Sequence, residues 1–132
     1  MSIVTLNISR TAQSGFTEAK DVKPNSERKY FYKYTGGNTS SNNGDFTTPT
    51  GTPISFTVSL GTSGYLIDKV KFSGSSNNDG SDDIATDKLS AVITDSAQHK
   101  GELKYTLVIE DTGDPGHPKN STFDCDPKVI NL

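Results

Sequence analysis

The sequence predicts an all-β protein, and three observations lead to that prediction. In residues 101–110, the apolar Leu103, Tyr105, Leu107 and Ile109 lie on one side of an extended chain. Mostly polar residues lie on the other side, which is the two-residue alternation of a half-buried strand. The same alternation recurs along the chain between clusters of Gly, Pro, Asn and Asp, and no helical period competes with it.

The strands are expected where this alternation is clear and turn-forming residues bound it. They cover residues 3–9, 28–34, 54–60, 65–72, 89–93, 101–110 and 129–132, with 15–21 ambiguous. The second is aromatic and the third alternates without a break, which suits a pleated, half-buried surface. The fourth is interrupted by Asp68, and the last closes the chain. We therefore expect a single immunoglobulin-like antiparallel β-sandwich of seven or eight strands, with a jelly roll or a small barrel as the alternative.

Three polar segments are too long for simple turns. They are residues 36–52, 74–83 and 111–126, all rich in Gly, Asn, Ser, Thr, Asp or Pro. Long loops without secondary structure are uncommon within compact domains and are usually functional or mobile. We expect them to gather at one end of the sandwich and to carry whatever binding the protein performs.

Composition limits the classes of function. A chain of 132 residues forms one domain, 1–132, and its net charge of −3 disfavours a nucleic-acid partner. The apolar runs are far shorter than the roughly 20 residues that span a membrane. A single cysteine allows no internal disulfide, which fits a reducing compartment. The N-terminus resembles a first strand more than a secretory signal, so a cytoplasmic location is expected.

The sharpest candidate for chemistry is the acidic loop 75–83. Calcium takes six to eight oxygen ligands, and a loop can supply them around a glycine turn. The residues that would bind it here are Asn77, Asp79, Asp82 and Asp83. The match to a helix-flanked calcium loop is partial, because Thr86 stands where a bidentate Glu is required. The alternative is a solvated loop made of turn-forming residues.

Two further groups are candidates for ligand contact. Asp111, Asp114 and His117 lie in a Pro- and Gly-rich segment, near Asp124 and Asp126 in sequence. They would bind a cation or a sugar hydroxyl, although Asp beside Pro or Gly is also simply favoured in turns.

The second group is Tyr30, Tyr32 and Tyr34, which share one face of a strand. Aromatic side chains stack on sugars and anchor protein contacts, but a face of three tyrosines is also good core material. We expect these tyrosines to be partly buried, and an exposed recognition surface is the alternative.

The sequence offers no recognisable catalytic set. Cys125 lies between two aspartates, whose charge disfavours a thiolate nucleophile, and the chain has only two histidines. No serine occupies a nucleophile-elbow motif, and no carboxylate pair stands out as that of a glycosidase. We therefore do not expect an enzyme.

The segment Phe-Asp-Cys-Asp-Pro-Lys-Val at residues 123–129 resembles the last strand of small bacterial β-sandwich proteins grouped as the DP-EP family. The resemblance implies a bacterial β-sandwich, and it implies no activity or catalytic residue. The acidic loop is also similar to the calcium-binding loops of small bacterial lectins, although the Asn-Trp-Pro type of ending found in one lectin group is missing.

Three functions follow, in order of preference. The first is a non-enzymatic interaction or accessory module that binds an unknown protein or carbohydrate through loops at one end. The second is a calcium-dependent, lectin-like carbohydrate-binding protein, with calcium as the only cofactor considered. The third is a small hydrolase with carboxylate chemistry. Pairing of sheet edges between chains is a further way in which the protein would form oligomers.

Overall fold

The computed structural model describes residues 2–24, 27–113 and 120–131. Within these residues the chain forms eleven strands and one short 3-10 helix, and it contains no helix long and apolar enough to cross a membrane. The elements are β1 (Ser2–Ser9), β2 (Thr17–Glu18), β3 (Lys20–Lys23), β4 (Phe31–Gly36), β5 (Phe46–Thr47), β6 (Ile54–Leu60), β7 (Tyr65–Ser73), η1 (Asn77–Asp79), β8 (Gly80–Ile84), β9 (Ser90–Asp95), β10 (Glu102–Asp111) and β11 (Thr122–Asn131).

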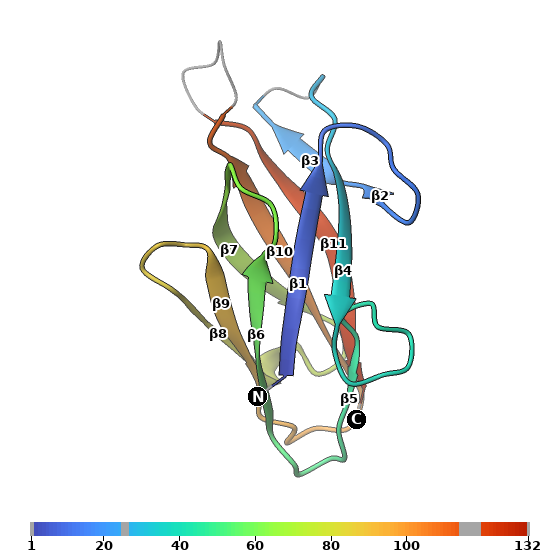
Figure 1. Cartoon of the computed structure of the whole chain (residues 1–132). Helices are drawn as coiled ribbons and strands as arrows, with labels where there is room; N and C mark the ends of the chain where they lie inside the picture. Colours follow the sequence, from blue (N-terminus) through green and yellow to red (C-terminus); the bar gives the residue numbers. More distant parts are fainter. Residues whose placement is uncertain (1, 25–26, 114–119, 132) are drawn as a thin grey trace.

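The strands form two sheets packed face to face (Figure 1). One sheet has six strands in the order β2-β4-β1-β6-β9-β8. The other has the order β3-β11-β10-β7, with β5 also paired to β11. Most neighbours are antiparallel, but β1 pairs with β6 and β5 pairs with β11 in parallel. Within the described residues neither sheet closes into a barrel, so the expected all-β sandwich is confirmed.

Three details of the sandwich differ from the expectation. Strands β8 and β11 extend into the segments 74–83 and 111–126, which were expected to be loops. The eleven strands of the described chain exceed the expected seven or eight because β8 was not expected and because β2, β3 and β5 are only two to four residues long. Alternation cannot reveal strands of that length. In addition, β1 lies inside its sheet, between β4 and β6. The first strand of an immunoglobulin domain lies at a sheet edge, so the strand order here is different.

The core lies between the sheets and takes one face of each long strand. Leu103, Tyr105, Leu107 and Ile109 of β10 are all fully buried, as their alternation predicts. On β11 the register shifts opposite the interval between Tyr105 and Leu107, close to Pro127. Proline has no N–H to give to the ladder, so a bulge is the expected local form there.

The aromatic strand faces this core. Tyr30, Tyr32 and Tyr34 are 0%, 5% and 4% exposed. The ring of Tyr30 stacks on Phe123 with centroids 4.1 Å apart, and Tyr34 meets Tyr105 edge to face. The expectation of buried tyrosines is therefore confirmed. The alternative, an exposed recognition surface made by these three residues, is wrong because their face of the strand packs against the opposite sheet.

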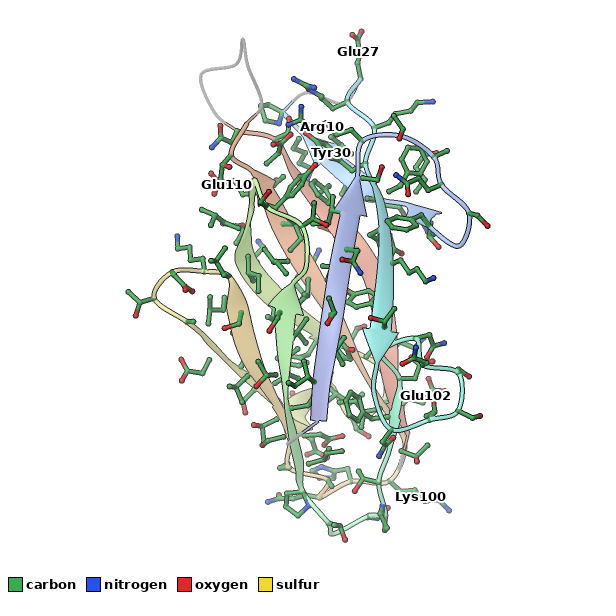
Figure 2. All side chains as sticks on the ribbon, in the orientation of Figure 1. Arg10, Glu27, Tyr30, Lys100, Glu102 and Glu110 are labelled. Atoms are coloured by element: carbon green, nitrogen blue, oxygen red, sulfur yellow. The ribbon has the colours of Figure 1, made fainter. Side chains whose placement is uncertain are left out.

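The long polar segments do not gather at one end, and this corrects the expectation. Strand β10 spans the sandwich, with Glu102 accepting a hydrogen bond from Ser76 at one end and Asp111 opposite Tyr65 at the other. Segments 36–52 and 74–79 therefore lie at the end where β10 begins, and the segment after β10 starts at the opposite end. Figure 2 shows this separation, with Lys100 at one end and Arg10 and Glu110 at the other.

Candidate functional site

Three connections meet at the end of the sandwich where β10 begins, and we call this region the loop end. It consists of residues 37–53, 74–79 and 96–101. The Ser96 N–H donates to Asp79 O over 2.9 Å, and the Gly51 N–H donates to Ala97 O over 2.6 Å. The connection 96–101 therefore joins the other two through main-chain hydrogen bonds.

The longest connection, 37–53, is also fixed to the sandwich. The side chain of Asn38 acts like a strand partner, because its Nδ2 donates to Thr47 O over 2.8 Å and its Oδ1 accepts from the Thr47 N–H over 2.7 Å. Tyr105, in the core, donates its hydroxyl to Gly44 O over 2.5 Å. The segment is thus held by a polar contact at its base and by a buried tyrosine beneath it.

The centre of the loop end is the pair Asp79 and His99. Asp79 closes η1, and its side chain is only 3% exposed, whereas the His99 side chain is 66% exposed. His99 Nδ1 lies 2.7 Å from Asp79 Oδ1, and the His99 N–H donates to Asp79 Oδ2 over 2.9 Å. One buried carboxylate therefore fixes both the backbone and the ring of an exposed histidine.

These contacts determine how Asp79 titrates. Burial alone would raise the pKa of Asp79, but hydrogen bonds from the His99 side chain and backbone and from the Ser96 side chain hold this pKa below its usual value. Asp79 therefore stays ionised and accepts the Nδ1–H of the imidazole. His99 then presents Nε2 to solvent, as an acceptor when the ring is neutral and as a donor when it is protonated.

A second carboxylate, that of Asp95 at the end of β9, lies close enough to Asp79 for their charges to interact. It is fully buried, its Oδ1 accepts the Ala97 N–H over 2.8 Å, and its Oδ2 has no hydrogen-bond partner within the described residues. Burial and the neighbouring charge of Asp79 raise the pKa of Asp95, and the Ala97 hydrogen bond opposes this only in part. Asp95 is thus a buried acidic group that lies beside the Asp79 carboxylate and whose Oδ2 has no hydrogen-bond partner within the described residues.

The four residues expected to bind calcium are not brought together. Asn77 and Asp79 lie in η1, whereas Asp82 and Asp83 are exposed neighbours on β8. Successive strand residues point to opposite faces, so Asp82 and Asp83 cannot both turn toward Asp79. The described residues contain no group of three or more His, Cys, Asp or Glu side chains suited to a metal. Calcium binding by these four residues stays a prediction.

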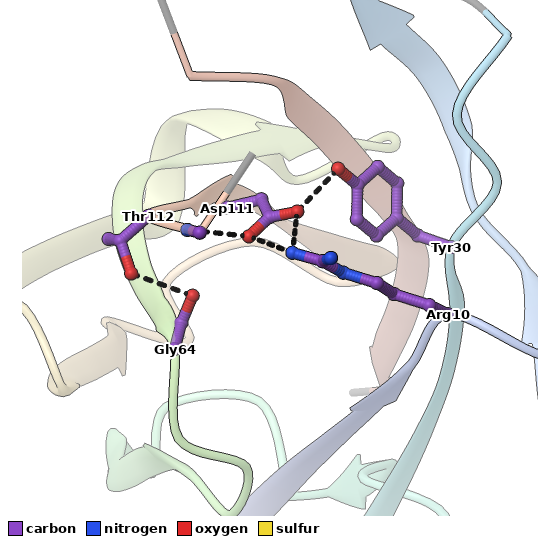
Figure 3. A network of polar contacts seen from close by, with 6 residues as sticks. Arg10, Tyr30, Gly64, Asp111 and Thr112 are labelled. Atoms are coloured by element: carbon purple, nitrogen blue, oxygen red, sulfur yellow. Dashed lines mark hydrogen bonds and ion pairs between the residues drawn. The ribbon is translucent and has the colours of Figure 1, made fainter. Parts of the chain in front are cut away.

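Asp111, which was predicted to contact a ligand, lies at the opposite end of the sandwich, where it is held by structural contacts (Figure 3). Asp111 is fully buried, and both of its oxygens accept from Arg10 Nη2, over 2.7 and 2.6 Å. The Tyr30 hydroxyl donates to Oδ2 over 2.7 Å, and the Gly113 N–H donates to Oδ1 over 2.9 Å. These contacts fix the end of β10 to the core. Asp114 and His117, predicted with Asp111, lie outside the described residues.

Asp124 does not join Asp111, although the sequence places both beside the same proline-rich segment. Its Oδ2 forms an ion pair with Lys71 Nζ over 2.6 Å. It lies between the buried Phe123 and Cys125 on β11 and therefore faces outward, whereas Asp111 takes an inward position on β10. The two carboxylates are on opposite faces of the sheet, so Asp111 and Asp124 do not form the acidic group that the sequence suggested.

Asp95 and His99 are the site residues that reading the sequence missed. Asp95 follows Ala91 and Ile93 in strict alternation, which places a carboxylate on the core face of its strand. That signal was available, since a buried ionisable side chain is uncommon and often functional. His99 gave no comparable signal, because its partner Asp79 lies twenty residues away in sequence.

Comparison of the sequence with known protein-family models and with curated proteins finds no match. The fold places the protein in the class of all-β sandwiches. The resemblance of residues 123–129 to the DP-EP family stays a prediction.

Proposed function

We propose that the protein is a non-enzymatic interaction module that binds its partner through the loop end, with His99 at the centre of the contact surface. The observation that carries this proposal is the pair formed by Asp79 and His99. Its geometry fixes an exposed imidazole to a buried carboxylate at 2.7 Å. A group held in this way loses little conformational freedom on binding, so more of the contact energy contributes to affinity.

The exposed side chains of the loop end indicate the chemistry of the ligand. Amides and hydroxyls dominate, among them Ser40, Ser41, Asn42, Asn77, Asn78 and Gln98. Neutral donors and acceptors of this kind suit the hydroxyl groups of a carbohydrate, since they hydrogen-bond without the desolvation of a full charge. A neutral glycan is therefore the ligand class that this surface fits best.

The test is a glycan array probed with the labelled protein. Wild type should bind a subset of neutral glycans, and His99→Ala or Asn78→Ala should weaken that binding at least tenfold. Gln13→Ala, an exposed change at the opposite end of the sandwich, is the matched control and should have no effect. Binding that survives the two loop-end changes, or an array without signal, would contradict the proposal.

A second candidate is calcium-dependent carbohydrate binding at the same end. It is favoured by the buried Asp95 Oδ2, which has no partner within the described residues and lies beside a second carboxylate. Repeating the array with calcium and with EDTA separates the two candidates. Signal lost in EDTA and absent in Asp95→Asn supports the calcium-dependent form. Signal unchanged in EDTA excludes it and leaves the first proposal in place.

A further inference from the structure

Strand β8 lies at an open edge of the six-stranded sheet. It pairs with β9 through residues 80–84, and no other strand of the described chain pairs with it. Its register with β9 is continuous, without a bulge, and the strand contains no proline. An edge of this kind presents unpaired main-chain groups that can pair with another extended chain.

The ladder with β9 shows which groups remain open. The Ala85 N–H donates to Ser90 O, so the pair Ala85 and Ser90 is of the hydrogen-bonded type. Bonded and non-bonded pairs alternate in antiparallel ladders, so Asp83 also pairs with β9. Asp82 and Ile84 then direct their N–H and C=O groups to the outside of the sheet, where no strand of the described residues pairs with β8.

The remaining sheet edges are protected. On β7, the Ile67 N–H is taken by Lys88 O, and the register with β10 shifts between Val108 and Ile109. β2 and β5 have two residues each, and β3 contains Asp21 with a positive φ of 54°. Short strands and irregular backbone are the usual ways of blocking edge pairing. Among the edge strands of the described residues, β8 is the one that is neither very short nor irregular.

This open edge is acidic. Asp82 and Asp83 are both exposed, and no salt bridge within the described residues engages either of them. Consecutive strand residues point to opposite faces, so each face of the edge carries one carboxylate. Burial and the charge of Asp83 raise the pKa of Asp82, which shows that the pair repels itself.

We propose that β8 binds an extended basic segment of another protein by strand addition. The main-chain groups of Asp82 and Ile84 supply the ladder, and the two carboxylates select the sequence. A partner strand laid beside β8 places one side chain near each carboxylate, on opposite faces, so two consecutive Lys or Arg residues fit best. Self-pairing of two β8 strands is disfavoured, because it would place like charges across from one another. This site is separate from the loop end and does not depend on the function proposed there.

The test uses a fluorescein-labelled peptide with a central Lys-Arg pair flanked by Val and Thr. Its anisotropy should rise saturably with protein, and the double variant Asp82→Asn, Asp83→Asn should weaken binding at least tenfold. The double variant Asp68→Asn, Asp87→Asn, which removes two exposed acidic groups that lie outside β8, is the charge-matched control and should leave affinity unchanged. An amide NMR spectrum of the double variant verifies that its fold is retained.

A second peptide distinguishes strand addition from simple charge attraction. It has the same sequence, with N-methyl groups on alternate main-chain amides, which keeps both charges but removes the ladder donors. Strand addition predicts loss of binding for this peptide. Equal binding of the methylated peptide, equal binding to the double variant, or no saturation up to millimolar protein would each overturn the proposal.

Discussion

The three aspartates that are buried among the described residues have different surroundings, and these surroundings decide what each carboxylate does. Asp111 is neutralised by Arg10 and satisfied by Tyr30, so it stabilises one end of the core. Asp79 is held by His99, so it orients an exposed ring. Asp95 keeps one oxygen without a partner in the described chain, so its charge is uncompensated. The contacts of an aspartate therefore decide whether it stabilises the core, orients another side chain or remains a buried charge without full compensation.

The pair of Arg10 and Asp111 should contribute strongly to stability. Arg10→Ala leaves a buried carboxylate without its cation, and the expected loss is about 3 kcal/mol in the free energy of unfolding. Lys71→Ala is the control, because it breaks the exposed ion pair with Asp124 and should cost under about 1 kcal/mol. Urea denaturation at pH 7 measures both. Equal losses for the two variants would contradict this account of the buried pair.

Asp79 should make stability depend on pH in a defined direction. Its folded pKa lies below the unfolded value of about 3.9, so the ionised group stabilises the fold above that pH. The contribution is lost as the pH falls through the folded pKa. Asp79→Asn should therefore be less stable than wild type at pH 7, with a difference that shrinks below about pH 4. A difference that stays constant from pH 7 to pH 3 would rule this out.

Asp95 should show the opposite sign. Its folded pKa is raised, so the ionised group opposes folding at neutral pH; the penalty shrinks as the pH falls below the folded pKa and is gone below the unfolded value of about 3.9. Asp95→Asn removes the charge and retains an oxygen for the Ala97 N–H, so this variant should be more stable than wild type at pH 7. The two melting temperatures should converge in acid. A less stable variant at pH 7 would show that Asp95 is compensated in solution.

Among the structural elements, the connections are held by specific contacts and are not loose chain. The connection 37–53 depends on two devices, the strand-like side chain of Asn38 and the hydroxyl of Tyr105 on Gly44 O. Composition alone indicates a polar loop of low complexity. The hydrogen bond from Tyr105 comes from a strand about sixty residues further along the chain, and local sequence cannot predict it.

Removing one of these devices should loosen one connection selectively. Tyr105→Phe keeps the buried ring and leaves Gly44 O without its donor, at an expected cost of about 1–2 kcal/mol. Amide hydrogen exchange should accelerate within 37–53, with little change in the long strands. Urea denaturation measures the cost, and exchange detected by mass spectrometry locates it. Uniform acceleration throughout the sandwich would mean that the bond supports the whole core instead.

For the molecule as a whole, the sequence predicted the architecture better than the arrangement of its loops. Alternation placed the inward residues of β1, β6 and β10 correctly, because a sheet with one buried face requires that pattern. The end at which each loop lies depends on strand order and direction, which alternation does not encode. The segment after β10 was therefore wrongly grouped with residues 36–52 and 74–83. The short strands were missed because they have too few residues to show a period.

The candidate site was predictable only in part. Asp79 was recognised because it lies in an acidic, Gly-containing loop, and it was predicted to be a calcium ligand. Within the described residues, it is not part of a group of side chains suited to a metal. Its actual neighbours are Asp95, at the end of β9, and His99, in the connection that follows, and both are far from Asp79 in sequence. Sequence reasoning found the carboxylate and missed the histidine that it holds.

The most direct test of the central claim, that Asp79 fixes His99 in a preformed binding surface, is amide hydrogen exchange followed by NMR. In wild type, the amides of Ser96 and His99 should be strongly protected, since both donate to Asp79. Asp79→Asn should speed exchange at His99, whose amide donates to the Asp79 side chain, while the Ser96 amide, which donates to the main-chain oxygen of Asp79, and the amides of β10 keep their protection. Rapid exchange of the Ser96 and His99 amides in wild type would contradict the claim, because the surface would then be mobile before any ligand arrives.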